Sequence, residues 1–325
     1  MQAERVLPMK IVILEGHAVN PGDLSWDVLN QFGTVTVYPR TAYEQAAQRI
    51  GDAEIVLINK TNLDAALMDR CPNLKLICVL ATGYNVVDCN AAKERGILVC
   101  NVPAYGTAAV AQFTFGLLLE LCHQIGAHSQ AVHRGDWTNC PDFCFWYTRQ
   151  SELAGKTMGI IGFGRIGQAV GSIAQAFGMR VLAYNRSVSE SGKAIGEYVD
   201  LDTLLKESDV ISLHTPLTPE TDRIINAKTI EKMKKGVILL NTARGGLIDE
   251  DAVAFALGTG KLGGLAADVV SAEPISPLNP LLTAPNCILT PHMAWAPIES
   301  RQRIIDCTVR SIAGFLKGEI VNAVN

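Results

Sequence analysis

The sequence predicts an α/β protein made of two doubly wound parallel-sheet domains. Two runs of alternating apolar strands and helical segments, at residues 9–100 and 157–289, point to this fold class. The strands in both runs are continuously apolar, as expected where helices cover both faces of a parallel sheet. The chain of 325 residues is also longer than one typical domain, which favours two.

The first run is long enough for a complete small α/β domain. Its candidate strands are Ile11–Leu14, Val35–Tyr38, Ile55–Ile58, Leu76–Leu80 and Ile97–Val99. Its candidate helices include Leu24–Phe32, Ala42–Ile50 and Asp88–Arg95. Because helices separate successive strands, we expect a parallel sheet.

A connecting region separates the two runs. Asn101-Val102-Pro103 breaks the first pattern, and a long apolar helix is expected from about Thr107 to His123. Residues 123–151 follow, with weak periodicity and a concentration of aromatic side chains that includes Trp137, Phe143, Phe145 and Trp146. We expect an arm here, which either contacts a second subunit or covers the core as an ordinary loop.

The second run contains six candidate strands. They are Met158–Ile161, Val181–Tyr184, Val210–Leu213, Val237–Asn241, Leu265–Asp268 and Cys287–Leu289. A final helix at about Ile298–Gly318 has no strand after it, and we expect it to pack on the first domain. The predicted domains are therefore residues 1–101 plus 298–325 and residues 102–297. The two chain crossings, Asn101–Pro103 and Trp295–Ile298, are the expected hinges.

Three glycines with the spacing G-x-G-x-x-G follow the first strand of the second run, and a helical pattern follows them. Gly162 permits a tight turn, Gly164 lets the backbone approach a pyrophosphate, and Gly167 lets the helix pack closely on the sheet. The free N–H groups of the helix N-terminus favour phosphates. Because the strand Val181–Tyr184 follows at the distance expected for a ribose contact, a dinucleotide site is favoured over a turn that binds nothing. The second domain is thus predicted to be a Rossmann domain.

Composition excludes several other classes. A hydrophobic content of 48% with 18% charged residues fits a globular protein with large cores, and a net charge of −4 without a basic stripe gives no reason to expect nucleic acid. No apolar run reaches membrane-spanning length, and residues 1–10 lack the apolar core of a signal peptide. Met1–Pro8 is expected to be a disordered extension.

The cysteine pattern indicates free thiols. There are nine cysteines, an odd number, and none forms a C-x-x-C pair. Cys140 and Cys144 lack the partners that a zinc site needs, so no metal is expected. Most of the nine lie in apolar segments, where cysteine behaves as a small hydrophobe, and free thiols favour a reducing, cytoplasmic setting.

Polar side chains follow the strands of the second run where those strands end. Arg244 follows the fourth strand, Asp268 and Glu273 follow the fifth, and His292 follows the sixth. Ligands of open α/β sheets bind outside the carboxyl ends of the strands, so these side chains are expected on one rim. Each alone has an ordinary structural interpretation, as a loop histidine, a helix N-terminal charge or a salt-bridge partner. Together they favour a catalytic site.

At these segments the chain resembles the NAD(P)-dependent D-isomer-specific 2-hydroxyacid dehydrogenases, from about Met9 onward. The resemblance is carried by Ala81–Asp88, Gly162–Gly167, Asn241–Asp249, Asp268-Val269 with Glu273-Pro274, and Thr290-Pro291-His292. Within the family, the chain looks most like the glycerate dehydrogenases, also called hydroxypyruvate reductases, at Asn20–Trp26, Val110–Gln112, Trp137–Trp146 and Ala294-Trp295.

The resemblance implies roles for the polar residues. His292 would give a proton to the substrate's keto oxygen as hydride arrives at the adjacent carbon, Glu273 would hold the imidazole, and Arg244 would grip the substrate carboxylate and polarise the carbonyl. Histidine titrates close to neutral pH and arginine is a permanent forked cation, so both suit these tasks. The implied substrate-binding residues are Thr82, Gly83 and Tyr84 through their backbone N–H groups, with Asn59 and Trp295.

The resemblance also implies the cofactor-binding positions. These are Thr107, Gly162, Gly164, Arg165, Ile166, Gly167, Asn185, Arg186, Ser187, His214, Thr215, Pro216, Thr221, Thr242, Ala243 and Asp268, the last binding the nicotinamide amide. His214 is expected near the cofactor but not as a base.

One position departs from the family's pattern. NAD-preferring members carry an acidic residue after the second strand, whereas this chain has Asn185, followed by Arg186 and Ser187. Without the carboxylate a 2′-phosphate is no longer rejected, and Arg186 could pair with it. Alternatively Arg186 stacks on the adenine or points to solvent. The expected cofactor is therefore NAD or NADP.

The sequence thus predicts a cytoplasmic oxidoreductase that reduces a short 2-keto acid, hydroxypyruvate or glyoxylate, to D-glycerate or glycolate. The family implies a homodimer through the dinucleotide-binding domain and a cleft between domains that closes on the substrate. The partners are small molecules, with no nucleic acid and no membrane. Alternatives are a dehydrogenase for D-lactate or phosphoglycerate, although only Lys60 offers a cation near Asn59–Asn62 for a phosphate. A further alternative is a dinucleotide-sensing, corepressor-like binding protein. The absence of low-complexity tails counts against this alternative.

Overall fold

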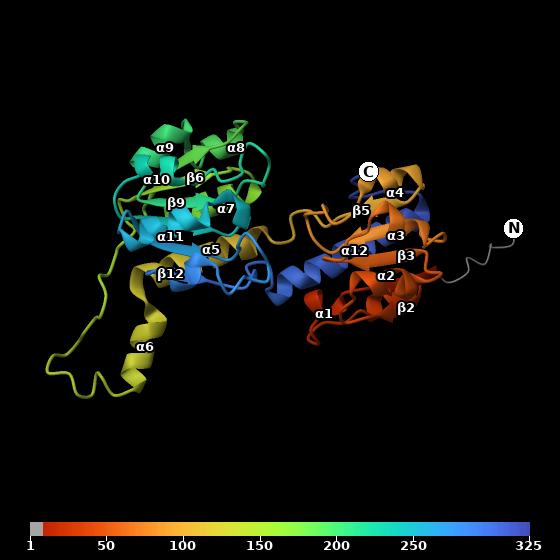
Figure 1. The fold of residues 1–325 in the computed structure, drawn as a ribbon, viewed down its shortest axis with the longest axis horizontal. Coiled ribbons are helices and arrows are strands. Elements are labelled where there is room, and N and C mark those ends of the chain that lie inside the picture. Colours follow the sequence, from red (N-terminus) through yellow and green to blue (C-terminus); the bar gives the residue numbers. More distant parts are fainter. Residues whose placement is uncertain (1–8) are drawn as a thin grey trace, which may run out of the picture. The chain divides into compact units, whose positions relative to one another are not determined.

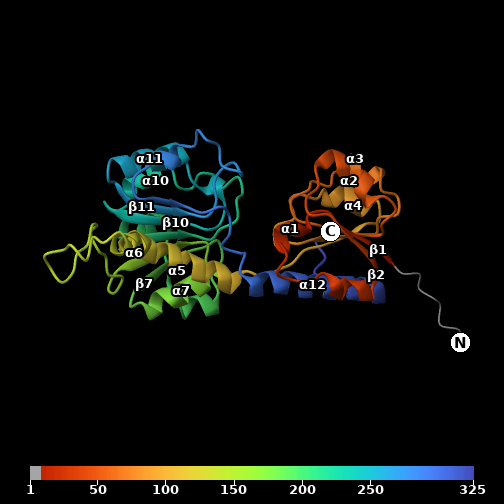
Figure 2. The same ribbon diagram turned by 90° about the horizontal axis from the view of Figure 1, so that it is seen from below.

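The computed structural model describes residues 9–325, which form two compact units (Figure 1). Unit 1 consists of residues 9–105 and 296–325, and unit 2 of residues 106–295. Each unit is built on one parallel sheet with helices on both faces (Figure 2), so the predicted fold class is confirmed. The expected disordered extension, Met1–Pro8, lies outside the described residues.

Unit 1 contains a five-stranded sheet with the order β2-β1-β3-β4-β5. The strands are β1 (Met9–Ile13), β2 (Gly33–Val37), β3 (Ile55–Ile58), β4 (Leu76–Val79) and β5 (Leu98–Cys100), and all neighbours are parallel. The helices are α1 (Gly16–Val19), α2 (Tyr43–Ile50), α3 (Ala65–Asp69), α4 (Cys89–Glu94) and α12 (Ile298–Lys317), with a 3₁₀ turn η1 (Asp27–Gln31). This strand order is flavodoxin-like, with its topological switch point between β1 and β3.

The C-terminal helix α12 is part of unit 1, where it packs against β4 on the face opposite α2, α3 and α4 (Figure 2). Arg301 anchors it. The buried guanidinium donates to both carboxylate oxygens of Asp23 at 2.6 Å, to the Val19 carbonyl at 3.0 Å and to the Ala296 carbonyl at 2.8 Å. Such charge-assisted, bidentate pairing fixes the helix against the N-terminal part of the unit.

The prediction of a helix at Leu24–Phe32 was wrong. Only the short 3₁₀ turn η1 forms, because the Asn20 side chain organises the preceding chain into a turn. Its Oδ1 accepts from the N–H groups of Gly22 and Leu24 at 3.0 Å, and its Nδ2 donates to the Leu24 carbonyl at 2.8 Å. Asparagine competes for local backbone groups in this way and opposes helix formation.

Unit 2 contains a seven-stranded sheet with the order β12-β11-β10-β9-β6-β7-β8. The strands are β6 (Thr157–Ile161), β7 (Arg180–Tyr184), β8 (Glu197–Tyr198), β9 (Val210–Leu213), β10 (Val237–Asn241), β11 (Leu262–Ala267) and β12 (Cys287–Leu289). The order matches a doubly wound dinucleotide-binding sheet with one added strand. The predicted number of six strands was one too few, because β8 has two residues and is too short for any apolar pattern.

The helices of unit 2 cover both faces of this sheet. They are α5 (Thr107–His123), α6 (Ile125–His133), α7 (Arg165–Ala176), α8 (Glu190–Lys193), α9 (Leu201–Glu207), α10 (Ala227–Lys232) and α11 (Glu250–Gly258), with 3₁₀ turns η2 (Gly245–Leu247) and η3 (Pro280–Thr283). Figure 2 shows α5 and α7 on one face and α10 and α11 on the other. α6 was not predicted, and with the loop after it, it projects away from the sheet (Figures 1 and 2).

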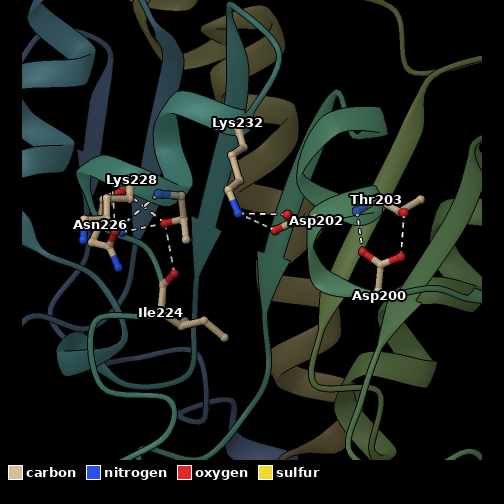
Figure 3. A network of polar contacts seen from close by, with 8 residues as sticks. Asp200, Asp202, Thr203, Ile224, Asn226, Lys228 and Lys232 are labelled. Atoms are coloured by element: carbon tan, nitrogen blue, oxygen red, sulfur yellow. Dashed lines mark hydrogen bonds and ion pairs between the residues drawn. The ribbon is translucent and has the colours of Figure 1, made fainter.

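Short polar side chains fix where α9 and α10 begin (Figure 3). The Asp200 carboxylate accepts from the backbone N–H of Thr203 at 2.9 Å and from its hydroxyl at 2.7 Å, and Asn226 forms a capping box at α10. Lys232 of α10 contacts Asp202 of α9 at 2.7 Å. These caps satisfy helix N–H groups that have no partner within the helix.

Within residues 9–325, no single helix is long and apolar enough to cross a bilayer. The pair α5 and α6, bent by 57° between them, passes a test of length and composition only when taken together.

Candidate functional site

The glycine-rich turn between β6 and α7 has a separate reason for each glycine. Gly162 has a φ of 93°, and a Cβ there would lie 2.4 Å from the Thr215 nitrogen. A Cβ on Gly167 would lie 2.2 Å from the Gly162 carbonyl oxygen, so this glycine allows the close contact of helix and turn. A Cβ on Gly164 would meet nothing within 4 Å. Gly164 therefore borders open space at the start of α7, where the N–H groups of residues 165–167 have no acceptor within the described chain.

The end of β7 lies beside this turn. Asn185 accepts from the backbone N–H of Phe163 at 3.1 Å and donates to the Ser187 carbonyl at 2.7 Å. The side chain thus ties the glycine turn to the next strand end. Arg186 is exposed and forms no ion pair with any residue in the range 9–325. Glu220 lies close enough for a coulombic interaction with it, and the exposed guanidinium can accept an anionic ligand group.

His214 follows β9 at the same edge of the sheet. Its Nε2 lies 2.8 Å from Ser212 Oγ, and its Nδ1 is buried with no partner in the described residues. Burial lowers the pKa of His214 from 6.5 to about 3, so the ring is neutral at physiological pH. Such a ring is unsuited to proton transfer at that pH.

The remaining predicted cofactor positions of unit 2 lie at helix starts or in loops at this edge. Thr107 is the first residue of α5. Thr221 donates to the Pro216 carbonyl at 2.7 Å and so shapes the loop after β9. Thr242 and Ala243 follow β10, and the Thr242 hydroxyl lies 2.9 Å from the buried Thr114 hydroxyl. The free helix N–H groups, the open side of Gly164 and the unpartnered Nδ1 of His214 fit a dinucleotide.

Arg244 follows β10 with an exposed side chain. The buried Asn241 fixes its backbone, donating to the Arg244 carbonyl at 2.9 Å and accepting from the Ala243 N–H at 3.1 Å. The guanidinium donates to the Ala243 carbonyl at 2.7 Å, and no carboxylate within residues 9–325 pairs with it. The salt-bridge interpretation of Arg244 therefore does not apply in the described structure, and the cation is available to a carboxylate ligand.

His292 and Glu273 form a close pair. Glu273 Oε2 lies 2.6 Å from His292 Nδ1, and both side chains are about one-third exposed. Glu273 lies in the loop between β11 and η3, so it is not a helix N-terminal charge. Trp295 Nε1 donates to the His292 carbonyl at 2.9 Å. Because Nδ1 is occupied, the ring presents Nε2 for chemistry.

The Asp268 carboxylate has a role that the sequence did not indicate. It is 1% exposed and accepts from the Thr290 hydroxyl at 2.6 Å, the Met293 N–H at 2.9 Å and the Ala294 N–H at 2.8 Å. These three bonds hold the loop in which His292 adopts a φ of 53°. A non-glycine residue in the left-handed region persists where its surroundings enforce it, which is common at functional sites.

The residues predicted to bind substrate through unit 1 follow β3 and β4. Asn59 is buried, and its Nδ2 donates to the Leu80 carbonyl at 3.2 Å. The backbone N–H groups of Thr82, Gly83 and Tyr84 donate to no acceptor within residues 9–325. Consecutive free N–H groups in a loop suit a carboxylate.

Comparison with known proteins adds a second line of support. Residues 115–294 match the family model described as D-isomer specific 2-hydroxyacid dehydrogenase, NAD binding domain. A hydroxypyruvate reductase of Blautia hydrogenotrophica is 54% identical over 321 residues, which is 98% of this chain and 100% of that protein. A glycerate dehydrogenase of Methylorubrum extorquens is 42% identical over 283 residues, 86% of this chain and 88% of that one. The chain belongs to the D-isomer specific 2-hydroxyacid dehydrogenase family.

A solved structure of similar fold extends the comparison. An acyclic imino acid reductase in complex with NADPH and D-Arg superposes with a TM-score of 0.83 at 30% identity, covering 98% of this chain and 100% of that chain.

Sequence reasoning missed one further residue in the site of this dehydrogenase. Glu250, at the start of α11, accepts from the Ser271 N–H at 2.8 Å, the Ser271 hydroxyl at 2.6 Å and Asn279 Nδ2 at 3.0 Å. It thereby fixes both ends of the loop that carries Glu273. No local pattern around Glu250 indicates this contact, because its partners are 21 and 29 residues away. Within residues 9–325, no cluster of histidine, cysteine and carboxylate side chains could hold a metal ion.

Proposed function

We propose that this dehydrogenase reduces hydroxypyruvate, and also glyoxylate, to the corresponding D-2-hydroxy acid with NADH or NADPH. The observation that carries the proposal is the His292–Glu273 pair, with its Nδ1–Oε2 distance of 2.6 Å. A carboxylate-held imidazole is a proton donor suited to a keto oxygen. The names of the hydroxypyruvate reductase and the glycerate dehydrogenase that the chain resembles support this choice of substrate.

The resemblance to the family assigns a role in this chemistry to each of the following residues. The N–H groups of Thr82, Gly83 and Tyr84 bind the substrate carboxylate, and Arg244 holds the carboxylate and polarises the carbonyl. A bound nicotinamide supplies the hydride. His292 donates a proton from Nε2 to the keto oxygen, while Glu273 holds Nδ1 and so orients the ring.

Cofactor oxidation tests the proposal. The purified protein is assayed with hydroxypyruvate, glyoxylate and pyruvate, each with NADH and with NADPH, and the assays are repeated with His292→Ala. We expect fast turnover of hydroxypyruvate that is lost in the variant, while the variant still binds the cofactor. Tight cofactor binding without turnover of any of the three acids would contradict the proposed activity.

We further propose that NADPH is accepted. Asn185 is neutral and its amide oxygen is used by the Phe163 N–H, while Arg186 is exposed and unpaired within residues 9–325. A carboxylate that would repel a 2′-phosphate is therefore missing at Asn185, and a guanidinium that could bind one is present. The NADPH complex of the similar imino acid reductase is consistent with this use.

Binding measurements distinguish the two cofactors. Dissociation constants for NADH and NADPH are measured by fluorescence for the wild type and for Arg186→Ala, with Arg149→Ala, outside the cofactor-binding positions, as the control. We expect Arg186→Ala to weaken NADPH binding by roughly tenfold, the value of one lost charge-assisted hydrogen bond, and to leave NADH binding unchanged. A large NADH preference in the wild type would contradict NADPH use.

We propose a homodimer formed through unit 2. α6 and the loop after it expose six large apolar side chains: Ile125, Val132, Trp137, Phe143, Trp146 and Tyr147, of which Phe143 is 89% exposed. A concavity of about 540 Å³ lies among residues of the same segment. An apolar surface of this kind usually becomes buried in an interface, and a second copy of the chain is the occupant that the family association favours. Sedimentation of the wild type and of a Phe143→Ser/Trp146→Ser variant tests this, and a monomeric wild type would contradict it.

We propose a cytoplasmic location for this enzyme. All nine cysteines are free, and free thiols persist in reducing compartments. Fractionation of the source cells with an antibody against the protein tests the location.

A further inference from the structure

In unit 1, one carboxylate oxygen of Glu15 accepts hydrogen bonds from three backbone N–H groups. Glu15 follows β1, and its Oε2 accepts hydrogen bonds from three successive backbone N–H groups after β3. The distances are 2.8 Å from Asn59, 2.8 Å from Lys60 and 2.9 Å from Thr61. Three consecutive N–H groups that converge on one oxygen form an anion-binding nest.

The position of this nest in the fold is informative. β1 and β3 are adjacent in the sheet order β2-β1-β3-β4-β5, and the chain reverses its winding direction between them. In sheets of this order, the carboxyl ends of the strands at this switch point are where a ligand binds. Here the protein fills that place with a carboxylate of its own.

Asn59 connects the nest by a hydrogen bond to the residue that precedes residues 81–85, the loop assigned to the substrate. Asn59, whose N–H contacts Glu15, donates from Nδ2 to the carbonyl of Leu80 at 3.2 Å, immediately before the loop. On the other side of the loop, the Thr82 hydroxyl donates to the Val102 carbonyl at 2.8 Å, and Asn101 Nδ2 donates to the Thr82 carbonyl at 2.7 Å. The free N–H groups of residues 82–84 are therefore held from both sides.

We propose that Glu15 is a positioning residue for the substrate-carboxylate loop. By fixing residues 59–61 through three charge-assisted hydrogen bonds, it holds Asn59, and through Asn59 it sets the start of residues 81–85. This inference rests on the proposed function, which assigns the N–H groups of residues 82–84 to the substrate carboxylate. Glu15 itself contacts neither substrate nor cofactor.

Kinetics separate positioning from general stability. We compare the wild type with Glu15→Ala, Glu15→Gln and the control Glu94→Ala, which removes an exposed glutamate of α4 in the same unit. We expect Glu15→Ala to raise the KM for hydroxypyruvate about tenfold, the value of about one charged hydrogen bond, with the dissociation constant of the reduced cofactor within about twofold of wild type. Glu15→Gln keeps an accepting oxygen and should be intermediate, and Glu94→Ala should behave as wild type.

Formate provides a readout that a merely structural role would not move. Glu15→Ala leaves three N–H groups without their acceptor, and formate supplies a carboxylate of the right size. We expect formate, in the absence of substrate, to raise the melting temperature of Glu15→Ala more than that of the wild type or Glu15→Gln. At low concentration it should also lower the raised KM of Glu15→Ala, whereas in the wild type it should only compete with the substrate.

The outcomes are distinguishable. An active wild type with an unchanged KM in Glu15→Ala contradicts the positioning role alone. An equal loss of cofactor affinity, with no selective effect of formate, also contradicts it, because it indicates general disruption of the fold. A wild type that turns over none of the keto acids contradicts the proposed function instead.

Discussion

His292 Nδ1 lies 2.6 Å from Glu273 Oε2, and the two residues follow the neighbouring parallel strands β12 and β11. Two loops that leave the same edge of one sheet thus bring together residues that are 19 positions apart. The contact fixes the orientation of the ring and directs Nε2 away from Glu273. Proton donation and ring positioning are therefore separable by mutation.

Replacement of His292 with Asn should lower kcat for keto-acid reduction by roughly 10²–10⁴-fold, the usual contribution of a general acid. Glu273→Gln keeps a hydrogen-bond acceptor for the ring but replaces a charged hydrogen bond by a neutral one, so it should cost less, about tenfold. Steady-state kinetics measures both, and cofactor binding, unchanged in both, serves as the control. A larger loss in Glu273→Gln than in His292→Asn would refute this division of roles.

Asp268→Asn should loosen the His292 loop. An amide presents an N–H₂ group where the carboxylate now accepts from the Thr290 hydroxyl and two backbone N–H groups, so at least one of these donors loses its partner. We expect a loss of about 2 kcal/mol in the free energy of unfolding, together with reduced kcat. Thr290→Val is the matched control, because it removes one donor and leaves the carboxylate in place. Urea denaturation and kinetics measure both effects, and equal behaviour of the two variants would argue against this role of Asp268.

Gly245→Ala should disrupt the site although it adds only a methyl group. A Cβ on Gly245 would lie 1.9 Å from the Val270 carbonyl carbon, so the chain after Arg244 and the chain before Glu273 could no longer pass each other. We expect loss of several kcal/mol of stability, as for severe overpacking, and loss of activity. At Gly258, the last residue of α11, a Cβ would meet nothing within 4 Å, and Gly258→Ala should be neutral or slightly stabilising. Thermal melting measures the stability of both variants, and similar melting temperatures for the two would contradict the prediction.

The elements that the sequence predicted best are those in which local pattern and burial agree. The strands Val210–Leu213 and Val237–Asn241 have the predicted bounds, and so does the helix Thr107–His123. Each is a largely apolar segment bounded by polar or turn-forming residues. The glycine spacing of Gly162–Gly167 similarly carried enough local information to place the turn before α7.

The contacts that complete the site were outside the reach of sequence patterns. Glu15 meets residues 44 to 46 positions away, and Asp268 meets a loop 22 to 26 positions away. Nothing near either carboxylate indicates which N–H groups it will accept from, because this depends on strand order. Sequence analysis placed Arg244, Glu273 and His292 on one rim by the strand-end rule, but it could not give the 2.6 Å contact or the unpaired state of Arg244 within the described residues.

His214 should give unit 2 a measurable dependence of stability on pH. Burial lowers its folded-state pKa to about 3, against 6.5 for the free side chain. Between these values the unfolded chain binds a proton that the folded chain does not, so its contribution to stability is complete above pH 6.5 and declines as the pH falls. The slope should approach about 1.4 kcal/mol per pH unit.

Urea denaturation of the cofactor-free protein between pH 7 and pH 4 measures this slope, and His214→Gln should remove it because glutamine does not titrate. The cause is burial rather than a neighbouring charge, so added salt, which screens surface charges, should leave the difference between wild type and variant unchanged. A difference that vanishes at high salt would indicate a surface charge effect instead. A slope equal in the two proteins would show that the ring of His214 is protonated in the folded state.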